Sequence, residues 1–262
     1  MSEFLYRTHP KLQKRVHRLG ICTNYGIDGR GMAEALERGQ NYVFWTQLRP
    51  SKATAPLREA LRRDRERVVV ATGPSIGYFG GNLRRATESA LRTLGTDYVD
   101  VLHLFWLGKT SAWTESTLDA MRELKASGKV RAFGVSIHDR KRAATLVRDV
   151  DVLMIRYNAA HPGAERDIFP SVEAARAGGE APLVVAYTAT SWRKLLRKAD
   201  AAGVHPTAAQ CYRFCLSSPS VDVVLSGPAS TEQMRENLEG VAAGPLTEAE
   251  LALMTDVGKK AA

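Results

Sequence analysis

The segment from Val221 to Gly240 joins an apolar run to an amphipathic helical pattern through the turn Gly-Pro-Ala-Ser (227–230). A strand that enters a helix through such a turn leaves backbone N–H groups unpaired at the positive end of the helix dipole, a setting that suits a phosphate. Ser230 is placed to cap this helix, and Glu232 and Glu236 fall in its first turns. Many strand-to-helix turns share these features, so the segment alone favours a capped structural turn.

The cysteines do not have the spacing of a metal site or a disulfide framework. They are Cys22, Cys211 and Cys215. An odd number without such spacing is typical of free thiols in a reducing compartment, so we expect a cytoplasmic protein. Cys211 and Cys215 share a helix face without a nearby His or Cys, and we predict that they fill the core and that the chain binds no metal. The sequence contains no readable Ser-His-acid arrangement.

The charge and hydropathy of the chain argue against macromolecular partners. A formal net charge of +9 raises a nucleic-acid hypothesis, but the basic residues are spread along the chain. Two basic clusters, 61–67 and 192–198, follow helical patterns and are predicted to be solvated faces. No apolar run approaches the ~20 residues that span a bilayer, and residues 1–20 lack the apolar stretch of a signal peptide. We expect a small-molecule substrate, no nucleic acid and no membrane.

The elements that must position the chemistry are short apolar runs that alternate with amphipathic helical patterns. The runs predicted as strands are 19–23, 41–45, 67–72, 98–106, 130–136, 150–157, 182–187 and 221–226. Strands separated by helices pair in parallel, because each return needs a crossover. This pattern predicts an α/β fold, a (β/α)8 TIM barrel formed by residues 1–262 as one domain. An open doubly wound sheet is the alternative, but the first strand lacks a glycine-rich dinucleotide fingerprint.

At the strand ends, where the chemistry of such a barrel lies, the sequence resembles the aldo/keto reductase superfamily. The similar segments are ESALRTLGTDYVDVLHL (88–104), LKASGKVRAFGVS (124–136), YN (157–158), VVAYT (184–188) and GPASTEQMRENL (227–238). They occur in the order and spacing of the family over nearly the whole chain. The resemblance implies an oxidoreductase that uses NADP(H).

The resemblance also implies which residues hold the cofactor. Thr23 would touch it near the first strand, Ser136 would contact the nicotinamide carboxamide, and Tyr187 would stack on the nicotinamide ring. The residues that would line the adenosine half are Gly227, Ser230, Gln233 and Asn237, with Arg235 beside the 2′-phosphate. Asn237 and Tyr187 also have a purely structural interpretation, as a packed helix residue and as an aromatic residue at the edge of the core.

The catalytic tetrad of the family is missing from this sequence. Hydride transfer to a carbonyl carbon produces an alkoxide, which needs a proton or a positive neighbour. Phe44 stands where the family has Asp, and Arg49 where it has the Tyr that acts as general acid. Gly73 replaces the Lys, and Phe105 replaces the His. Removing both charges and adding two rings leaves no unpaired buried ion, so we predict an apolar, re-specified site.

Other residues could supply the proton. The catalytic candidates are Tyr25 after the first strand, Arg49 after the second and His138 after the fifth. His103 should point into the barrel below the site, where a lone histidine is more often structural.

The strand ends also predict a ligand. The substrate-binding candidates are Phe44, Arg49, Phe105, Trp106 and Arg156, with Lys109 near the same rim. Apolar rings below cations suit an aromatic or apolar body that carries a carboxylate or phosphate. In the alternative interpretation Arg156 pairs internally with Asp100 or Asp151.

Three functions stay open. An oxidoreductase with a changed proton pathway is favoured by the turn 227–230, which suits a phosphate, and by Ser136 and Tyr187. This is the prediction that we adopt. A non-redox enzyme, such as a lyase or isomerase, is favoured by the loss of the tetrad. It is also favoured at two positions that contact the carboxamide in the family, where Ile137 replaces Asn and Met154 replaces Gln. A non-catalytic nucleotide- or ligand-binding protein is the third, because one barrel fold hosts many functions.

Overall fold

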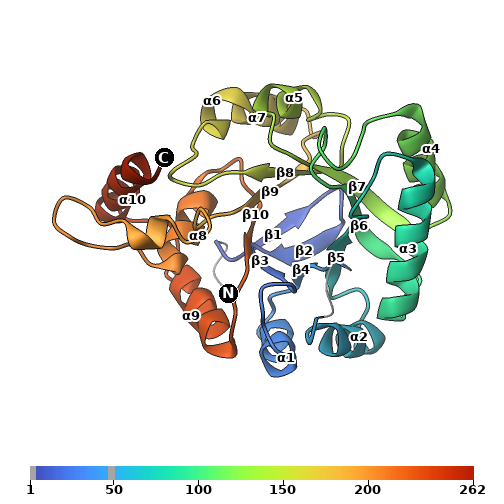
Figure 1. Ribbon diagram of the computed structural model, residues 1–262, viewed down its shortest axis with the longest axis horizontal. Helices are drawn as coiled ribbons and strands as arrows, with labels where there is room; N and C mark the ends of the chain where they lie inside the picture. The colour runs from blue at the N-terminus through green and yellow to red at the C-terminus, as the bar shows by residue number, and fades with distance from the viewer. Residues whose placement is uncertain (1–3, 47–50) are drawn as a thin grey trace.

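Eight parallel strands close into a barrel in the computed structural model, which describes residues 4–46 and 51–262 (Figure 1). The strands are β3 (Leu19–Cys22), β4 (Tyr42–Phe44), β5 (Val69–Thr72), β6 (Val99–Leu104), β7 (Val130–Ile137), β8 (Val152–Arg156), β9 (Leu183–Tyr187) and β10 (Val223–Ser226). They follow one another around the barrel in chain order, and β10 closes it against β3. The predicted strands and the (β/α)8 fold are confirmed, and the open doubly wound sheet is wrong.

Helices return the chain along the outside of the barrel (Figure 1). They are α1 (Gly29–Glu37), α2 (Thr54–Arg63), α3 (Gly80–Leu94), α4 (Glu115–Ala126), α5 (Arg140–Thr145), α6 (Ala164–Asp167), α7 (Phe169–Ala177), η1 (Leu195–Arg197), α8 (Ala208–Ser217), α9 (Thr231–Ala242) and α10 (Glu248–Ala261). Side-chain caps start several of them; Thr114, for example, accepts a hydrogen bond from Thr117 N–H at the start of α4. Among the described residues, no helix has the length and apolar character needed to cross a membrane.

The alternation of side chains along each strand divides the core in two. One set, which includes Ile21, Val43 and Val70, packs outward under the helices. The other points into the barrel and ends in Phe44 and Tyr187 at the carboxyl ends of the strands. Strand parity therefore decides which side chains reach that end of the barrel.

A two-stranded antiparallel hairpin, β1 (Tyr6–His9) and β2 (Lys14–His17), closes the other end of the barrel (Figure 1). Leu12 and Val16 belong to the interior cluster, and Asn41 at the start of β4 accepts a hydrogen bond from His17 N–H. The sequence analysis did not predict this hairpin. The site therefore has to lie at the opposite, open end.

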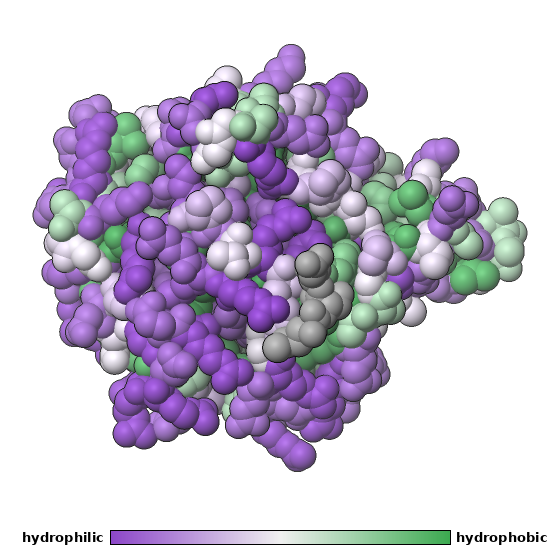
Figure 2. Space-filling model, turned by 180° about the vertical axis from the view of Figure 1, so that it is seen from behind, coloured by the Kyte–Doolittle hydropathy of each residue, from purple (hydrophilic) through white to green (hydrophobic). Residues whose placement is uncertain are grey.

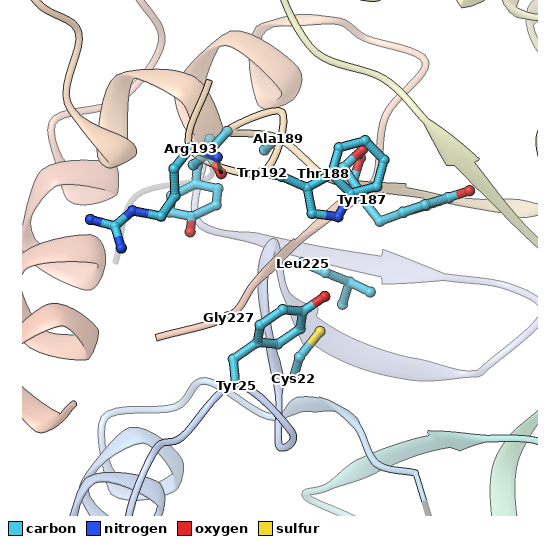
Figure 3. Close-up of a pocket in the computed structure, with 11 residues that line it drawn as sticks. Cys22, Tyr25, Tyr187, Thr188, Ala189, Trp192, Arg193, Leu225 and Gly227 are labelled. Atoms are coloured by element: carbon cyan, nitrogen blue, oxygen red, sulfur yellow. Dashed lines mark hydrogen bonds between the residues drawn. The ribbon is translucent and has the colours of Figure 1, made fainter. Parts of the chain in front are cut away.

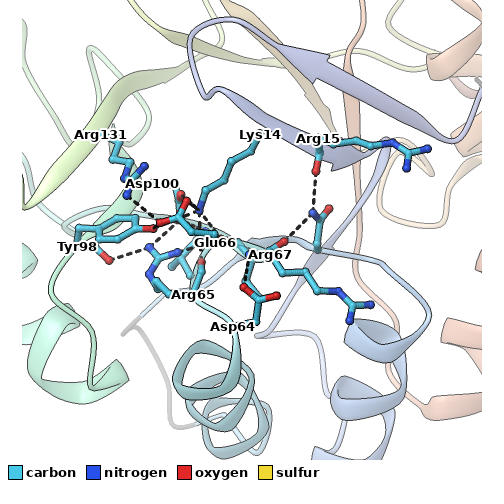
Figure 4. A network of polar contacts seen from close by, with 12 residues as sticks. Lys14, Arg15, Asp64, Arg65, Glu66, Arg67, Tyr98, Asp100 and Arg131 are labelled. Carbon is cyan, nitrogen blue, oxygen red and sulfur yellow. Dashed lines mark hydrogen bonds and ion pairs between the residues drawn. The ribbon is translucent and has the colours of Figure 1, made fainter.

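In the basic cluster 61–67, Arg62, Arg63 and Arg67 are exposed, as predicted for a solvated face, but Arg65 belongs to a partly buried polar network (Figure 4). Arg65 and Lys14 each lie 2.8 Å from a carboxylate oxygen of Asp100, which is buried. Arg65 and Arg131 also stack on the Tyr98 ring, at 3.6 Å and 3.9 Å from its centroid. Arg65 reaches this network because α2 ends at Arg63 and the chain turns under the barrel before β5 begins.

The second basic cluster, 192–198, is also not the predicted amphipathic helix. Only the short 3₁₀ helix η1 forms there, because Ser191, Trp192 and Arg193 adopt positive φ angles that a helix does not contain. The loop from Thr188 to Arg193 thus folds back over the open end of the barrel.

Candidate functional site

A cavity of about 530 Å³ opens at the carboxyl ends of the strands. Its walls are mainly aromatic, from Phe44, Phe105, Trp106, His138 and Tyr187. The polar side chains that line it are Asn24, Thr46, Ser75, Thr110 and Ser136. A mostly apolar cavity with a few polar groups is the usual form of a small-molecule site.

The floor of the cavity is a cluster of three rings. Phe44 and Phe105 have ring centroids 5.3 Å apart, and His103 lies below, stacked on Phe105 at 5.8 Å. Burial lowers the pKa of His103 to about 3, so the ring is neutral near pH 7. Neither ring nitrogen has a hydrogen-bond partner among the described residues. His103 thus packs in the barrel interior, as expected from the alternation of side chains along β6.

Gly73, where the sequence resemblance places the tetrad Lys, leaves no room for a side chain. A Cβ atom there would lie 2.3 Å from the His103 carbonyl oxygen and 3.1 Å from the Phe105 ring. The lysine is therefore excluded by the backbone of β6 as well as by the ring that replaces the tetrad His.

Ser136, Met154 and Tyr187 form the wall on the β7 to β9 side. Met154 and Ser136 are paired across β7 and β8, and Ile137, the next residue, faces the outer core. Burial raises the pKa of Tyr187 to about 12, although the charge of Arg156 opposes this shift. Tyr187 is thus a neutral ring that faces the cavity.

A second cleft, of about 270 Å³, continues from the cavity toward Gly227. The two share the lining residues Cys22, Tyr25, Tyr187, Trp192 and Leu225. Figure 3 shows Tyr25 and Cys22 facing Tyr187 and Trp192 across Leu225. The cavity and the cleft therefore form one groove across the ends of β7, β8, β9, β10 and β3.

The loop after β9 supplies residues that the sequence analysis missed. They are Thr188, Thr190, Trp192 and Arg193, which all line the cleft. Thr188, Trp192 and Arg193 have φ values of 57°, 52° and 69°, which are unusual for residues other than glycine. Such backbone strain concentrates at functional sites. The sequence gives no signal for it, because none of these positions is glycine or asparagine.

Several buried polar atoms along the groove have no hydrogen-bond partner among the described residues. Asn24 Oδ1 and the Tyr187 hydroxyl belong to residues that line the groove, whereas Thr23 Oγ1 and Ser191 Oγ are buried behind its lining. Leaving such groups unpaired costs on the order of 1–3 kcal/mol each. A ligand that hydrogen-bonds to Asn24 and Tyr187 in the groove would offset part of this cost.

The turn 227–230 forms the predicted helix cap. Ser230 accepts a hydrogen bond from Gln233 N–H at 3.3 Å, and Gln233 Oε1 accepts one from Ala229 N–H at 2.9 Å. A Cβ atom on Gly227 would lie 2.6 Å from the Tyr25 ring. Tyr25 therefore packs directly on the turn, and a phosphate bound there has to displace or slide past this ring.

Arg235 is held by an acid of α1. Its guanidinium binds Glu34 in a bidentate manner, with distances of 2.8 Å and 2.6 Å. Asn237 is buried in α9. To bind a 2′-phosphate, Arg235 has to leave or share Glu34.

His138 is a wall residue and does not cap α5. Its ring lies 5.5 Å from Trp106 and 5.9 Å from Tyr187, whereas Asp139 accepts the capping hydrogen bond from Arg142 N–H. Burial lowers the pKa of His138, and the charge of Arg156 lowers it further. His138 is therefore mainly neutral near pH 7.

Arg156 makes no hydrogen bond or ion pair with any described residue through its side chain. The alternative interpretation, in which it pairs with Asp100 or Asp151, is wrong. Asp100 binds Lys14 and Arg65, and Asp151 binds Lys125. Arg156 pairs with Tyr187 across β8 and β9, and it lies behind the His138 and Tyr187 rings rather than in the cavity wall itself.

The remaining catalytic candidates differ in their surroundings. Arg49 lies outside the described residues. Tyr25 is 54% exposed, yet burial of its hydroxyl end raises its pKa. Tyr25 is therefore not tuned as a strong proton donor, since a general acid works best with a pKa near the working pH.

The cysteines do not form a reactive centre. Burial raises the pKa of the Cys22 thiol to about 12, although this residue lines both the cavity and the cleft. Cys211 and Cys215 are buried in the core, as predicted. In residues 4–46 and 51–262, no three His, Cys, Asp or Glu side chains come together as a metal site.

Sequence comparison places this chain in a known family. Residues 32–178, more than half of the chain, match the model of the aldo/keto reductase family. The chain belongs to the aldo/keto reductase family.

Individual relatives are distant. The chain is 22% identical to the uncharacterized oxidoreductase YqkF of Bacillus subtilis, over 83% of each protein. It is 30% identical to norsolorinic acid reductase B of Aspergillus parasiticus, over 42% of this chain and 35% of that protein. The structure of aldo-keto reductase AKR11C1 from Bacillus halodurans in its holo form superposes with a TM-score of 0.75, at 22% identity, over 98% of this chain and 96% of that one. This structural likeness supports the fold.

Proposed function

We propose that the protein is an NADP(H)-binding oxidoreductase that lacks the proton relay of its family and acts on a small, anionic aromatic molecule. The observation that carries this proposal is the continuous groove from Ser136 and Tyr187 to Gly227, whose lining includes the unpartnered polar atom Asn24 Oδ1. The three buried thiols are consistent with a cytoplasmic location.

The residues present fit such a nucleotide. Tyr187 offers a ring for stacking and Ser136 a hydroxyl group for the carboxamide, whereas Thr23 is buried and lines neither the cavity nor the cleft. Arg193 and the turn at Gly227 line the cleft, so they are the groups for the phosphates. When bound, the cofactor would supply a hydride.

The proton has to come from a group other than a tuned tyrosine. Candidates are Tyr25, His138 and Arg49. The raised pKa of Tyr25 and the lowered pKa of His138 leave neither as a strong acid near pH 7. The chain therefore favours a substrate whose reduced form needs little proton donation, or one that carries its own acidic group.

The proposed substrate follows from the floor and the rear wall. Phe44, Phe105 and Trp106 give stacking surfaces, and the cation Arg156, which pairs with no described acid, lies beside the His138 and Tyr187 rings. An aromatic body with a carboxylate or phosphate satisfies both features.

A second candidate is a non-redox enzyme or a binding protein that no longer uses NADP(H). It is favoured by the Tyr25 ring on Gly227 and by the Arg235–Glu34 pair, which both occupy expected nucleotide contacts.

The fluorescence of the reduced nicotinamide separates the two candidates. Wild-type protein is expected to change the NADPH emission in a saturable way, because the ring stacks on Tyr187. Tyr187→Leu should lose this change, whereas the control Tyr78→Leu, on an exposed tyrosine outside the groove, should retain it. If the wild-type protein leaves the emission unchanged at all concentrations, the second candidate replaces the first.

A further inference from the structure

A separate cavity, of about 430 Å³, lies at the closed end of the barrel and shares no lining residue with the groove. We call it the basal cavity. Its charged lining residues are Arg7 of β1, Arg176 of α7 and Asp222, which directly precedes β10. Three segments that are far apart in the chain therefore meet around one space, at the end of the barrel that the hairpin β1–β2 closes.

Asp222 holds the two arginines together. It is 1% exposed, and its Oδ1 atom accepts a hydrogen bond from Arg7 Nη1 at 2.5 Å and one from Arg176 Nη2 at 3.2 Å. Its Oδ2 atom accepts hydrogen bonds from Val184 N–H at 2.8 Å and from Arg176 Nη2 at 3.3 Å. One carboxylate thus serves two guanidinium groups, and the lining of the basal cavity keeps an excess of positive charge.

A third guanidinium group, that of Arg18, lies beside this pair. Its Nε donates to the backbone carbonyl of Asp222 at 3.2 Å. Its remaining hydrogen bonds go to the backbone carbonyl groups of residues 4, 216 and 221. Burial lowers the pKa of Arg18 to about 10, and the charges of Arg7 and Arg176 lower it further while that of Asp222 opposes them. Arg18 therefore stays charged near pH 7 and adds to the positive field of the basal cavity.

The acids of the surrounding segments are used elsewhere. Glu173 accepts a hydrogen bond from the Ser220 hydroxyl at 2.9 Å, and Glu180 binds Arg148. His9 also lines the basal cavity, but burial lowers its pKa, so the ring is mainly neutral near pH 7. The positive charge of the cavity therefore comes from its arginines.

Both lining arginines keep unused N–H groups. Arg7 Nη1 donates to Asp222 and to the Pro219 carbonyl, whereas its Nε and Nη2 groups donate to no residue that the structure describes. Arg176 donates to the same carbonyl through Nη1 and to Asp222 through Nη2, which leaves its Nε group unused among those residues. The two side chains are 31% and 34% exposed, so the unused groups can reach a ligand in the cavity that both residues line.

Exposure alone does not distinguish a site on this protein. The chain has a formal net charge of +9, and the face drawn in Figure 2 is mainly hydrophilic. Arg7 and Arg176 differ from an ordinary basic surface because they come from two elements, share one buried carboxylate and line one cavity. Their positions are fixed before a ligand binds, which lowers the entropy cost of binding.

We propose that the basal cavity binds a phosphate group, free or carried by a small molecule, between Arg7 and Arg176. Two adjacent N–H groups of a guanidinium fit two oxygens of a phosphate, and a tetrahedral anion accepts further hydrogen bonds from a second side. A carboxylate offers only two oxygens in one plane. The lining also includes Pro10 and Ala181, whose apolar surfaces would contact the organic part of a phosphate ester. This site lies outside the groove and goes beyond the proposed function.

Calorimetry without nucleotide tests the inference with three probes at one fixed ionic strength: inorganic phosphate, glycerol 3-phosphate and acetate. At least one of the two phosphates should bind saturably, with an affinity about tenfold or more above that of acetate, since an additional charge-assisted hydrogen bond contributes on that scale. Tighter binding of glycerol 3-phosphate identifies a phosphate ester as the ligand class. Equal or tighter binding of inorganic phosphate identifies the free anion.

Variants locate the bound phosphate. Arg7→Lys keeps a cation beside Asp222 but removes the free pair of N–H groups, so it should weaken phosphate binding by about tenfold. Arg176→Lys should weaken it in the same direction. The matched control is Arg15→Gln, which removes an exposed arginine of the same hairpin that does not line the basal cavity, and it should change little. Arg193→Gln, in the cleft, should retain the binding.

Three results would overturn the inference. One is the absence of saturable binding of either phosphate up to millimolar concentration. Another is equal weakening by Arg15→Gln and Arg7→Lys, which indicates a general field effect. The third is binding that is lost in Arg193→Gln and retained in Arg7→Lys, which places the phosphate in the groove. NADPH binding should be unchanged in Arg7→Lys, so the basal cavity and the proposed function fail separately.

Discussion

Phe44 and Phe105 touch in the mouth of the barrel, with ring centroids 5.3 Å apart, at the positions where the aldo/keto reductase resemblance places an Asp and a His. The contact joins β4 and β6 across the space above β5, where Gly73 has no side chain. The two rings and Gly73 thus form one packed unit. The packed rings make the floor of the site apolar, so replacing a single one of these residues by a charged one would not rebuild a tetrad.

We expect negligible reduction of ordinary aldehydes. General acid catalysis typically contributes ~10²–10⁴-fold, and the sequence resemblance places Arg49 and Gly73 at the positions of the tuned Tyr–Lys pair. With NADPH bound, kcat/KM for 4-nitrobenzaldehyde should therefore be lower than in family members with a complete tetrad by at least about 10²-fold. Steady-state loss of nicotinamide absorbance measures this. Turnover at ordinary family rates would mean that Tyr25 or another donor substitutes well, and Tyr25→Phe would then abolish it.

Adding one methyl group at Gly73 should destabilise the fold. Gly73→Ala is expected to cost about 1–3 kcal/mol, because its Cβ atom meets the His103 carbonyl oxygen at 2.3 Å. The matched control is Gly81→Ala in α3, where nothing lies within 4 Å of the added atom. That change should stabilise the protein by about 0.5–1 kcal/mol, because alanine favours the helix. Urea unfolding gives both values, and equal effects of the two variants would contradict this packing.

Stability should fall in acid partly because of His103. Its folded pKa of about 3 lies below the value of 6.5 for a free histidine, so the unfolded chain takes up a proton that the folded chain refuses. Below about pH 6.5 this removes up to about 1.4 kcal/mol of unfolding free energy per pH unit. His17, with a pKa lowered to about 4 by burial, adds a similar slope.

His103→Met isolates the first contribution. Unfolding free energies between about pH 7 and about pH 5 should decline less steeply in this variant, by up to about 2 kcal/mol over the range. The idea fails if wild type and variant show the same dependence on pH.

Releasing Arg235 should strengthen NADPH binding. In Glu34→Gln the guanidinium no longer has a carboxylate partner and becomes available for a 2′-phosphate. We expect a two- to fivefold gain for NADPH, about the worth of a partly exposed ion pair, and no change for NADH. Arg235→Gln should remove the gain. Equal effects on both nucleotides would place the 2′-phosphate elsewhere.

Much of the fold could be predicted because strands buried on both sides are continuous apolar runs, as in 221–226 for β10. The hairpin β1–β2 was missed because its strands, YRTH and KRVH, are short and charged. A helix over 192–198 was predicted because the sequence has helical spacing, but three consecutive positive φ angles are set by packing over the groove and not by residue type.

The same distinction holds in the site. Strand parity directs Phe44 of β4 and Phe105 after β6 into the barrel on either side of β5, where Gly73 has no side chain, so their contact follows from the sequence. The Arg235–Glu34 pair joins α9 to α1, and the position of Arg193 depends on a loop. Neither the Arg235–Glu34 pair nor the position of Arg193 can be recognised from a regular spacing of residues in the sequence.

Calorimetric titration of the wild-type protein with NADPH and NADH tests the central claim most directly. The proposed function predicts saturable binding of NADPH that is about tenfold tighter than the binding of NADH. A charge-assisted hydrogen bond to the 2′-phosphate contributes about 1.5–3 kcal/mol, and part of this free energy offsets the loss of the Arg235–Glu34 pair. Absence of heat up to millimolar NADPH would contradict it and assign the groove to a non-redox enzyme or a binding protein.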